Sequence, residues 1–308
     1  MRNGNKPLGI ICAVLLAFLG TLLLILLYRS GEEPSSVQLS PPSLTVPGQE
    51  ETRQTAGKPL EEEWSFKDPI IFPPLPEAID SFQPPQAGSK RLAILIDDLG
   101  WNLAMARRLL QIDAPLTFAI LPGLPYSQTV AEEAHARQRE ILLHLPMEPH
   151  GYPQIDPGAG ALFSSMSEEE LEAMVRKNLT LVPYIKGVNN HMGSKLTEQG
   201  WAMEVVCRVL KEQNLFFVDS MTSPKSVAYT TAHRIGLRTA YRHIFFDHEQ
   251  REEVIRQQVR KLATLAQKNG GAIGIGHPHP ETIRVLEEMI PQLQKEGFTV
   301  VPVSQLLH

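Results

Sequence analysis

The chain has 308 residues, of which 43% are hydrophobic and 20% charged, and its formal net charge is −5. This length allows one large domain with additional segments, and the composition is that of a globular protein. The mildly acidic balance gives no reason to expect nucleic acid as a partner. The two cysteines, Cys12 and Cys207, provide neither a disulfide framework nor a Cys-x-x-Cys metal or redox site.

The N-terminal segment predicts a membrane anchor. Leu8–Tyr28 carries no charged residue and is long enough to cross a bilayer, which would then be a partner of the chain. Arg2 and Lys6 precede it, so the positive-inside rule places the N-terminus in the cytoplasm. We therefore expect residues 1–29 to form a cytoplasmic tip and a single pass through a bacterial-type inner membrane, with the rest periplasmic or otherwise extracytoplasmic. A cleaved signal peptide is the alternative, but the apolar run lacks a small-x-small cleavage site.

Residues 30–89 have a different composition. Prolines interrupt every long periodicity, and serine, glutamine and glutamate fill most of the gaps. This composition is typical of a semi-extended, Pro-rich linker. We therefore expect the folded domain to occupy residues 90–308.

From Arg91 onward, short apolar runs alternate with longer amphipathic stretches, which predicts βαβ units and a parallel sheet. The expected strands are Leu92–Ile96, Thr117–Leu121, Glu140–Leu145, Lys186–Asn190, Leu215–Val218, one strand within Leu237–Phe246, Ala272–Gly276 and Phe298–Val301. The expected helices are Leu103–Leu110, Thr129–Arg139, one that begins after Ser167, Trp201–Gln213, Glu252–Lys268 and one that begins at Pro280. Ser167 and Glu170 have the spacing of a capping box.

Two adjacent carboxylates, Asp97 and Asp98, follow the first apolar run. They would lie at the carboxyl end of a buried strand, which is where α/β folds place their chemistry. Neighbouring carboxylates repel each other unless a cation or a shared proton compensates. The alternative is that one carboxylate caps the next helix and the other is solvated.

Polar residues follow at least five of the apolar runs. They are Asp97 and Asp98, His144, Asn190 and His191, Asp219, and His277. A closed barrel brings all strand ends to one mouth, whereas an open doubly wound sheet uses few of them, so we expect a TIM-like (β/α) barrel with irregularities. Each histidine taken alone could be a core, turn or helix-start residue. Together with the carboxylates they suit zinc or a similar divalent ion.

Other common catalytic signatures are missing. The chain contains no Gly-x-Gly-x-x-Gly, no P-loop and no Gly-x-Ser-x-Gly elbow. Ser194 and Ser220 follow strand-like runs without an elbow context. The sequence therefore favours metal chemistry over a serine hydrolase or a dinucleotide-binding enzyme.

Four segments resemble a known family. They read Ile-Asp-Asp-Leu-Gly at 96–100, His-Leu-Pro-Met-Glu-Pro at 144–149, Asn-Asn-His-Met-Gly-Ser at 189–194 and Gly-Ile-Gly-His-Pro-His at 274–279. In this order, within Arg91–His308, they resemble the divergent branch of the polysaccharide deacetylases. The resemblance implies a barrel related to the TIM barrel and metal-dependent removal of acetyl groups from a glycan, with zinc the favoured metal.

The resemblance also implies roles for individual residues. Asp97 corresponds to the general base and Asp98 to the carboxylate ligand of the metal. His144 corresponds to the first metal-binding histidine, and His277 to the general acid that protonates the leaving group. Asp219 would orient a partner in the mouth of the barrel.

The third ligand has two candidates. Glu148 occupies the place of the second histidine in the family's His-x-x-x-His motif, and His191 is the alternative from another strand. We favour His191, because a neutral imidazole reproduces the charge of an Asp-His-His site. Asn190, Ser194 and His279 are the expected substrate contacts.

Besides Glu148, the chain departs from the family pattern at two further places: Leu99 separates the two aspartates from Gly100, and the usual Arg-x-Pro segment is absent. The predicted function is that of a membrane-anchored, extracytoplasmic metallohydrolase that deacetylates an envelope or extracellular polysaccharide. The alternative is a non-catalytic glycan-binding or scaffold protein that retains the barrel.

Overall fold

The structure is a computed structural model, and it describes residues 90–308. The expected anchor, Leu8–Tyr28, and the Pro-rich linker lie outside the described residues. Among the residues that are described, no helix is both long enough and apolar enough to cross a bilayer. The anchor, the linker and their boundaries therefore stay predictions.

The described chain alternates strands and helices, as the sequence predicts. The strands are β1 (Arg91–Leu99), β2 (Thr117–Ile120), β3 (Glu140–Met147), β4 (Gly187–Met192), β5 (Phe216–Asp219), β6 (Thr239–Tyr241), β7 (Ile244–Phe245), β8 (Gly271–Gly276) and β9 (Thr299–Val300). The α-helices are α2 (Leu103–Leu110), α3 (Ser127–Ala136), α4 (Glu168–Leu179), α5 (Gly200–Glu212), α6 (Ala228–Ile235), α7 (Glu252–Asn269) and α8 (Pro280–Lys295). Two short 3-10 helices, η1 (Leu196–Glu198) and η2 (Val303–Leu306), complete the described elements.

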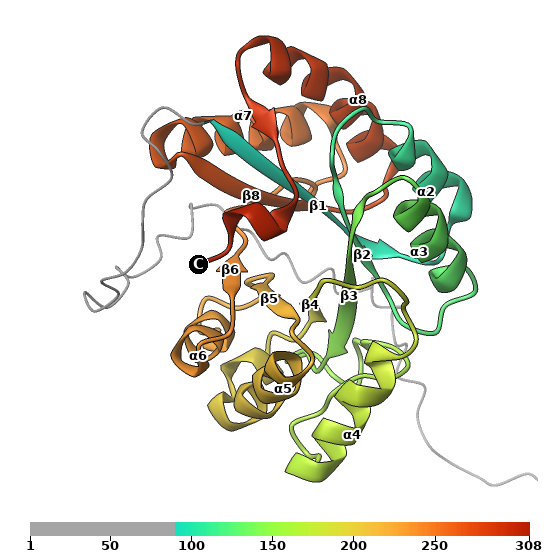
Figure 1. The fold of residues 1–308 in the computed structure, drawn as a ribbon, viewed down its shortest axis with the longest axis vertical. Coiled ribbons are helices and arrows are strands. Elements are labelled where there is room, and N and C mark those ends of the chain that lie inside the picture. The colour runs from blue at the N-terminus through green and yellow to red at the C-terminus, as the bar shows by residue number, and fades with distance from the viewer. Residues whose placement is uncertain (1–89) are drawn as a thin grey trace, which may run out of the picture. The chain divides into compact units, whose positions relative to one another are not determined.

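The strands form one curled, parallel sheet. Its order is β6-β5-β4-β3-β2-β1-β8-β7, and every ladder between these neighbours is parallel. The short β9 pairs in parallel with the first two residues of β1. The helices lie around the outside of the curl (Figure 1). This architecture is consistent with the expected TIM-like barrel.

The barrel is irregular where its two edges meet. Thr239–Tyr241 pairs with β5, and only two residues later Ile244–Phe245 pairs with β8. One continuous segment therefore reaches both edges of the sheet, although no described ladder joins β6 to β7. His243 occupies the corner between them, where its Nδ1 accepts a hydrogen bond from the backbone N–H of Ile273 at 3.1 Å. The single strand expected within Leu237–Phe246 is thus split in two.

The sheet separates two apolar cores because strand side chains alternate between its faces. The inner core includes Ala93, Leu95, Leu142, Val218, Ala240, Ile273 and Ile275. The C-terminal η2 adds Val303 and Leu306 to this core. Val303 also donates its backbone N–H to Thr117 Oγ1 at 3.1 Å, at the amino end of β2. The interior is therefore filled at the amino ends of the strands, and polar residues occupy inward positions at the carboxyl ends.

The helix starts follow the predicted capping chemistry. Ser167 Oγ accepts the N–H of Glu170 at 3.2 Å, and the Glu170 carboxylate accepts the N–H of Ser167 at 2.8 Å, so the capping box is formed. Pro280 is the first residue of α8, where its missing N–H costs nothing. These caps define where the loops that follow β3 and β8 end and the helices α4 and α8 begin.

Candidate active site

The end of β1 presents two consecutive carboxylates to the barrel mouth. Asp97 continues the inward phase of Ala93 and Leu95, so its side chain is buried inside the barrel. Asp98 would face outward in a regular strand, but it adopts φ +55° within a bulge between the pairs Ile96–Phe118 and Leu99–Ile120. The bulge turns Asp98 toward the same site as Asp97. Leu99 then fills the outer core, which accounts for its insertion before the glycine.

Asp98, His144 and His191 converge on one point. Asp98 Oδ1 lies 2.8 Å from His191 Nδ1 and 3.2 Å from His144 Nε2, and these two nitrogens lie 3.2 Å apart. Ligand atoms about 2.0–2.1 Å from a tetrahedral zinc ion are separated by about 3.3 Å, so the spacing is close to that of a zinc site. The three residues come from β1, β3 and β4.

The hydrogen bonding of this cluster also fits a cation. Asp98 Oδ1 is buried and makes no hydrogen bond of acceptable geometry, despite the two nitrogens beside it. A proton can satisfy only one pair of the three atoms at a time, whereas a cation between them would satisfy all three. Burial by itself raises the pKa of Asp98, but the close approach of the His144 and His191 imidazoles to its carboxylate lowers that pKa well below its usual range. Asp98 is therefore a carboxylate ready to act as a ligand.

Glu148, the alternative third ligand, lies outside this cluster. Its Oε1 pairs with Lys195 Nζ at 2.8 Å, and its Oε2 accepts the N–H of Ser164 at 2.7 Å. These bonds outweigh the effect of burial and lower the pKa of Glu148. Of the two candidates, His191 lies beside Asp98, whereas Glu148 is bonded to Lys195 and Ser164.

Asp97 lies beside the cluster as a buried carboxylate. Its Oδ2 is 3.6 Å from His144 Nε2, and its Oδ1 accepts the Nδ2–H of Asn189 at 2.8 Å. Burial raises its pKa from the ordinary value, against the opposing charges of His144 and His277. A carboxylate with a raised pKa is suited to accept a proton near neutral pH. Asn189 is a residue that the sequence reasoning missed.

His277 faces the same space from the end of β8. Its Nε2 lies 3.7 Å from Asp98 Oδ2, and its Nδ1 lies 3.0 Å from Asp247 Oδ1. Burial acts to lower the pKa of His277, but Asp247 in particular, helped by Asp98 and Asp97, raises it to about 9. His277 therefore holds a proton at neutral pH, as a general acid requires. Asp247 was not among the residues expected from the sequence.

A second group of potential ligands, Asp247, His277 and His279, is less suited to a metal. Asp247 Oδ2 already accepts the N–H of His277 at 2.7 Å and the hydroxyl of Thr282 at 2.7 Å. Its Oδ1 faces His277 Nδ1, so both oxygens of Asp247 already have partners within the chain. Asp247 and His277 therefore form an acid–base dyad.

Asp219, expected in the mouth, faces the helical layer instead. The inward positions of β5 are Phe216 and Val218, so Asp219 is out of phase with them. Its oxygens accept the N–H of Met221, the hydroxyl of Ser226 and the N–H of Tyr229, at 2.7–3.1 Å. In this structure Asp219 orders the loop before α6, and Asp247 is the carboxylate that orients His277.

The three expected substrate contacts also have partners within the chain. Asn190 Oδ1 accepts the N–H of Ser220 at 2.9 Å, and its Nδ2 donates to Met192 O at 2.8 Å. Ser194 Oγ accepts the N–H of His150 at 3.0 Å. These two side chains connect the loops after β3, β4 and β5. His279 is the N-cap residue of α8, with its ring centroid 5.7 Å from that of His277.

Comparison with known proteins assigns the family. The family described as divergent polysaccharide deacetylase matches residues 94–307. The chain belongs to this family. The resemblance seen in the sequence is thereby confirmed, and the matched range contains the whole Asp98–His144–His191 cluster.

Two curated relatives support the assignment of the chain to the divergent polysaccharide deacetylases. The uncharacterised protein YibQ of Escherichia coli (strain K12) is 38% identical over 218 residues, which cover 71% of this chain and 67% of YibQ. An uncharacterised protein of Haemophilus influenzae is 36% identical over 206 residues, which cover 67% of this chain and 73% of that protein. The crystal structure of uncharacterised protein ATU2773 from Agrobacterium tumefaciens C58 matches the fold with a TM-score of 0.69 and 25% identity, over 72% of this chain and 90% of that one.

A partly buried cation, Arg242, interacts electrostatically with two carboxylates of this divergent polysaccharide deacetylase. Arg242, which follows β6, donates from Nε to Ser220 O at 2.7 Å and from Nη2 to Met221 O at 2.8 Å. Burial lowers its pKa to about 10, against the opposing charges of Asp219 and Asp97. The positive charge of Arg242 thus favours the ionised form of Asp97, in a chain that lacks the family's usual Arg-x-Pro segment.

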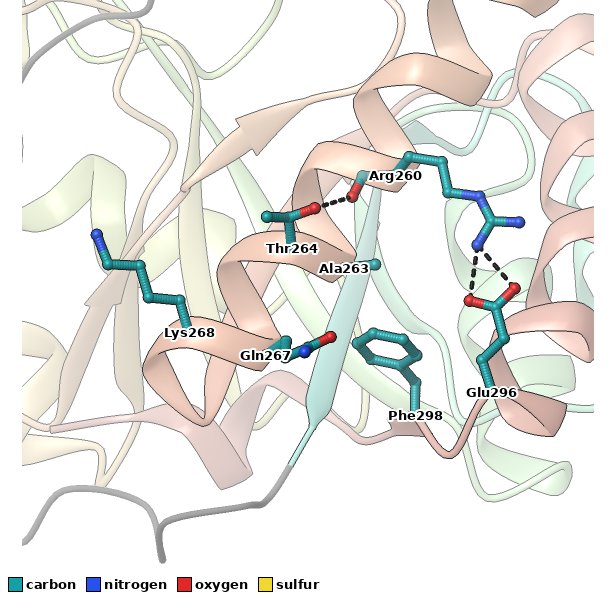
Figure 2. A pocket seen from close by; sticks show the side chains of 7 residues that line it. All are labelled: Arg260, Ala263, Thr264, Gln267, Lys268, Glu296 and Phe298. Atoms are coloured by element: carbon teal, nitrogen blue, oxygen red, sulfur yellow. Dashed lines mark hydrogen bonds and ion pairs between the residues drawn. The ribbon is translucent and has the colours of Figure 1, made fainter.

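A groove of about 500 Å³ lies away from these residues (Figure 2). It is lined by Arg260, Ala263, Thr264, Gln267, Lys268, Glu296 and Phe298. Figure 2 shows Arg260 directed at Glu296, and their atoms lie 2.8 Å apart. The lining comes from the second half of α7 and from the chain that leads into β9, which lie at the amino ends of β8 and β1. The groove is therefore at the opposite end of the barrel from the candidate active site.

Proposed function

We propose that this chain is a metal-dependent hydrolase that removes acetyl groups from a polysaccharide. The observation that carries the proposal is the convergence of Asp98, His144 and His191, whose ligand atoms lie 2.8–3.2 Å apart. Asp97 lies on one side of this cluster, and His277 lies on another. A proton acceptor, a cation site and a proton donor are the three parts that hydrolysis of an amide or ester needs.

The ligand set fits zinc better than magnesium or calcium, because two of its three members are imidazoles. A divalent cation held there would supply Lewis-acid chemistry, activating water and polarising the acetyl carbonyl. Asp97 would take the proton of the attacking water, for which its raised pKa is suited. Asp97 is within hydrogen-bonding distance of Asn189 and close to His144, so its carboxylate is held in place for this task.

His277 would complete the reaction. Its pKa of about 9 keeps the imidazole protonated at neutral pH, and Asp247 fixes the ring so that Nε2 faces the site. From there the proton can pass to the leaving amine or alkoxide as the bond to the acetyl group breaks. The acetyl group leaves as acetate, and the glycan carries a free amine or hydroxyl.

The substrate class and location belong to the same proposal. Membership of the divergent polysaccharide deacetylases supports an acetylated glycan as substrate. The uncharged run Leu8–Tyr28, with Arg2 and Lys6 before it, supports an inner-membrane anchor with residues 90–308 on the extracytoplasmic side. An envelope or extracellular polysaccharide would then be within reach of the barrel.

The full-length chain provides the test. Purified protein is analysed for bound metal and for acetate release from acetylated chito-oligosaccharides and from peptidoglycan. We expect about one divalent ion per chain, its loss in Asp98→Ala, and loss of acetate release with the metal retained in Asp97→Asn. Asp113→Asn makes the same chemical change at an exposed position at the amino end of β2, and it should match the wild type.

The competing function is non-catalytic glycan binding. It predicts that the wild-type chain retains acetylated oligosaccharides but releases no acetate at any metal loading. Acetate release that disappears in Asp97→Asn would reject that function. Wild-type protein that binds neither metal nor oligosaccharide would reject both.

A further inference from the structure

Asn189 lies between the metal cluster and the proposed base, in β4. We propose that its side-chain amide is the positioning group that holds His144 and Asp97 in register, and that it thereby sets the affinity of the site for its cation. This inference rests on the proposed function for the roles of Asp97 and His144. It adds a residue whose side chain touches neither the substrate nor the cation.

The contacts of Asn189 reach β3, β1 and the residue that follows β5. Its Oδ1 lies 3.0 Å from His144 Nδ1, and its Nδ2 donates to Asp97 Oδ1 at 2.8 Å and to Ser220 Oγ at 3.1 Å. His144 and Asn189 are direct neighbours in the ladder between β3 and β4, so their side chains point inward side by side. Asn189 is fully buried, and its three partners are at most 5% exposed.

The orientation of the amide follows from its partners. An ionised Asp97 can only accept hydrogen bonds, so the NH₂ group of Asn189 must face it. The amide oxygen then faces His144 Nδ1, which must carry a proton in order to donate to it. The lone pair of His144 is thereby left on Nε2, the nitrogen that faces Asp98 and His191. Asn189 thus selects the tautomer of His144 that can bind a metal.

The side-chain amide of Asn189 contacts both a proposed metal ligand, His144, and the proposed base, Asp97. Its oxygen acts on a metal ligand, and its nitrogen acts on the base, so a change at one atom of Asn189 affects only one of them. Asn189→Asp keeps an oxygen acceptor for His144 but places a second carboxylate against Asp97. Asn189→Ala removes both contacts. These two variants therefore separate the role in metal binding from the role in orienting the base.

The test measures the affinity of the metal-free, full-length chain for zinc by competition with a chelating dye, together with acetate release. We expect Asn189→Ala to bind zinc about 10- to 100-fold more weakly, the range found when groups that orient metal ligands are removed. We expect Asn189→Asp to bind zinc at least as tightly as the wild type, but to release acetate at least tenfold more slowly. The matched control is Asn178→Ala, which removes a buried amide bonded to Gly160 O outside the site and should leave zinc affinity unchanged.

The outcomes are distinguishable. Zinc affinity within threefold of the wild type in folded Asn189→Ala would overturn the inference while leaving the proposed function in place. Weaker zinc binding in Asn189→Asp, equal to that of Asn189→Ala, would also overturn it. If Asn189→Ala does not fold, the isosteric Asn189→Asp decides the question alone. A wild-type chain whose zinc affinity depends on Asn189 but which releases no acetate would reject the proposed function and keep the metal-positioning role.

Discussion

His277 and Asp247 are joined by two hydrogen bonds, one from the imidazole Nδ1 to Oδ1 at 3.0 Å and one from the backbone N–H to Oδ2 at 2.7 Å. The carboxylate thus fixes both the ring and the strand end that carries it. Thr282 Oγ1, from the first turn of α8, donates to the same Oδ2 at 2.7 Å. The proposed general acid is therefore oriented by a residue 30 positions earlier in the chain.

The first prediction concerns this pair. Asp247→Asn removes the negative charge that raises the pKa of His277, so the imidazole should lose its proton at neutral pH. Acetate release should fall by about 10²- to 10⁴-fold, the usual contribution of general acid–base catalysis. Bound metal should be retained, because Asp247 is not in the Asp98–His144–His191 cluster. Histidine NMR titration of the metal-free chain gives the pKa directly, and an unchanged value would contradict the assignment.

The second prediction concerns the pH dependence of stability in the metal-free chain. The pKa of His277 is raised from 6.5 to about 9 on folding, so its contribution is fully present below pH 6.5 and is lost as the pH rises through 9. The difference in unfolding free energy between wild type and His277→Gln should therefore shrink by up to about 3 kcal/mol between these limits. Urea unfolding at several pH values measures this difference. A difference that is constant across the window would argue against the raised pKa.

The third prediction separates the two candidate metal ligands. His191→Ala should abolish tight binding of the divalent ion, because it removes one of the three converging atoms. Glu148→Gln should retain the ion and instead lower the free energy of unfolding by about 1 kcal/mol, since it weakens partly buried bonds to Lys195 and Ser164. Metal analysis and denaturant unfolding of both variants provide the readout. The reverse pattern would identify Glu148 as the ligand.

The fourth prediction concerns Asp219. Asp219→Ala leaves the N–H groups of Met221 and Tyr229 and the hydroxyl of Ser226 without their acceptor. The buried N–H of Tyr229 left unpaired costs about 1–3 kcal/mol, and the partly buried Met221 and Ser226 donors add to this, so the variant should be destabilised. Metal content per folded chain should be unchanged, because Asp219 faces away from the cluster. Loss of metal from folded Asp219→Ala would instead show that Asp219 contributes to the metal site.

Much of the architecture could be predicted from the sequence, because it depends on local patterns. The apolar runs predicted the strands within a few residues, and the Ser167–Glu170 capping box and Pro280 marked true helix starts. The expected strand within Leu237–Phe246 was split, because a closing barrel requires this segment to pair with two different neighbours. No periodicity within ten residues reports such a change of partner.

The inward placement of Asp97, His144 and His277 also follows from the sequence alone. Each continues the period-two phase of apolar residues that face the interior, and this phase is a local property of a strand. The same rule could have shown that Asp219 is out of phase with Val218 and faces the helices. The alternation of side chains along each strand therefore distinguishes the inward Asp97, His144 and His277 from the outward Asp219.

What only the tertiary structure decided was which side chains meet across the strands. Asp98 reaches the cluster through a bulge and a positive φ, His191 reaches it through the register of β4 on β3, and Asp247 reaches His277 across β7 and β8. Register and bulges depend on the packing of whole strands against one another, so residues distant in sequence are brought within 3 Å by contacts that no local pattern encodes. The sequence by itself determined which residues could carry the chemistry, and the fold selected those that lie together.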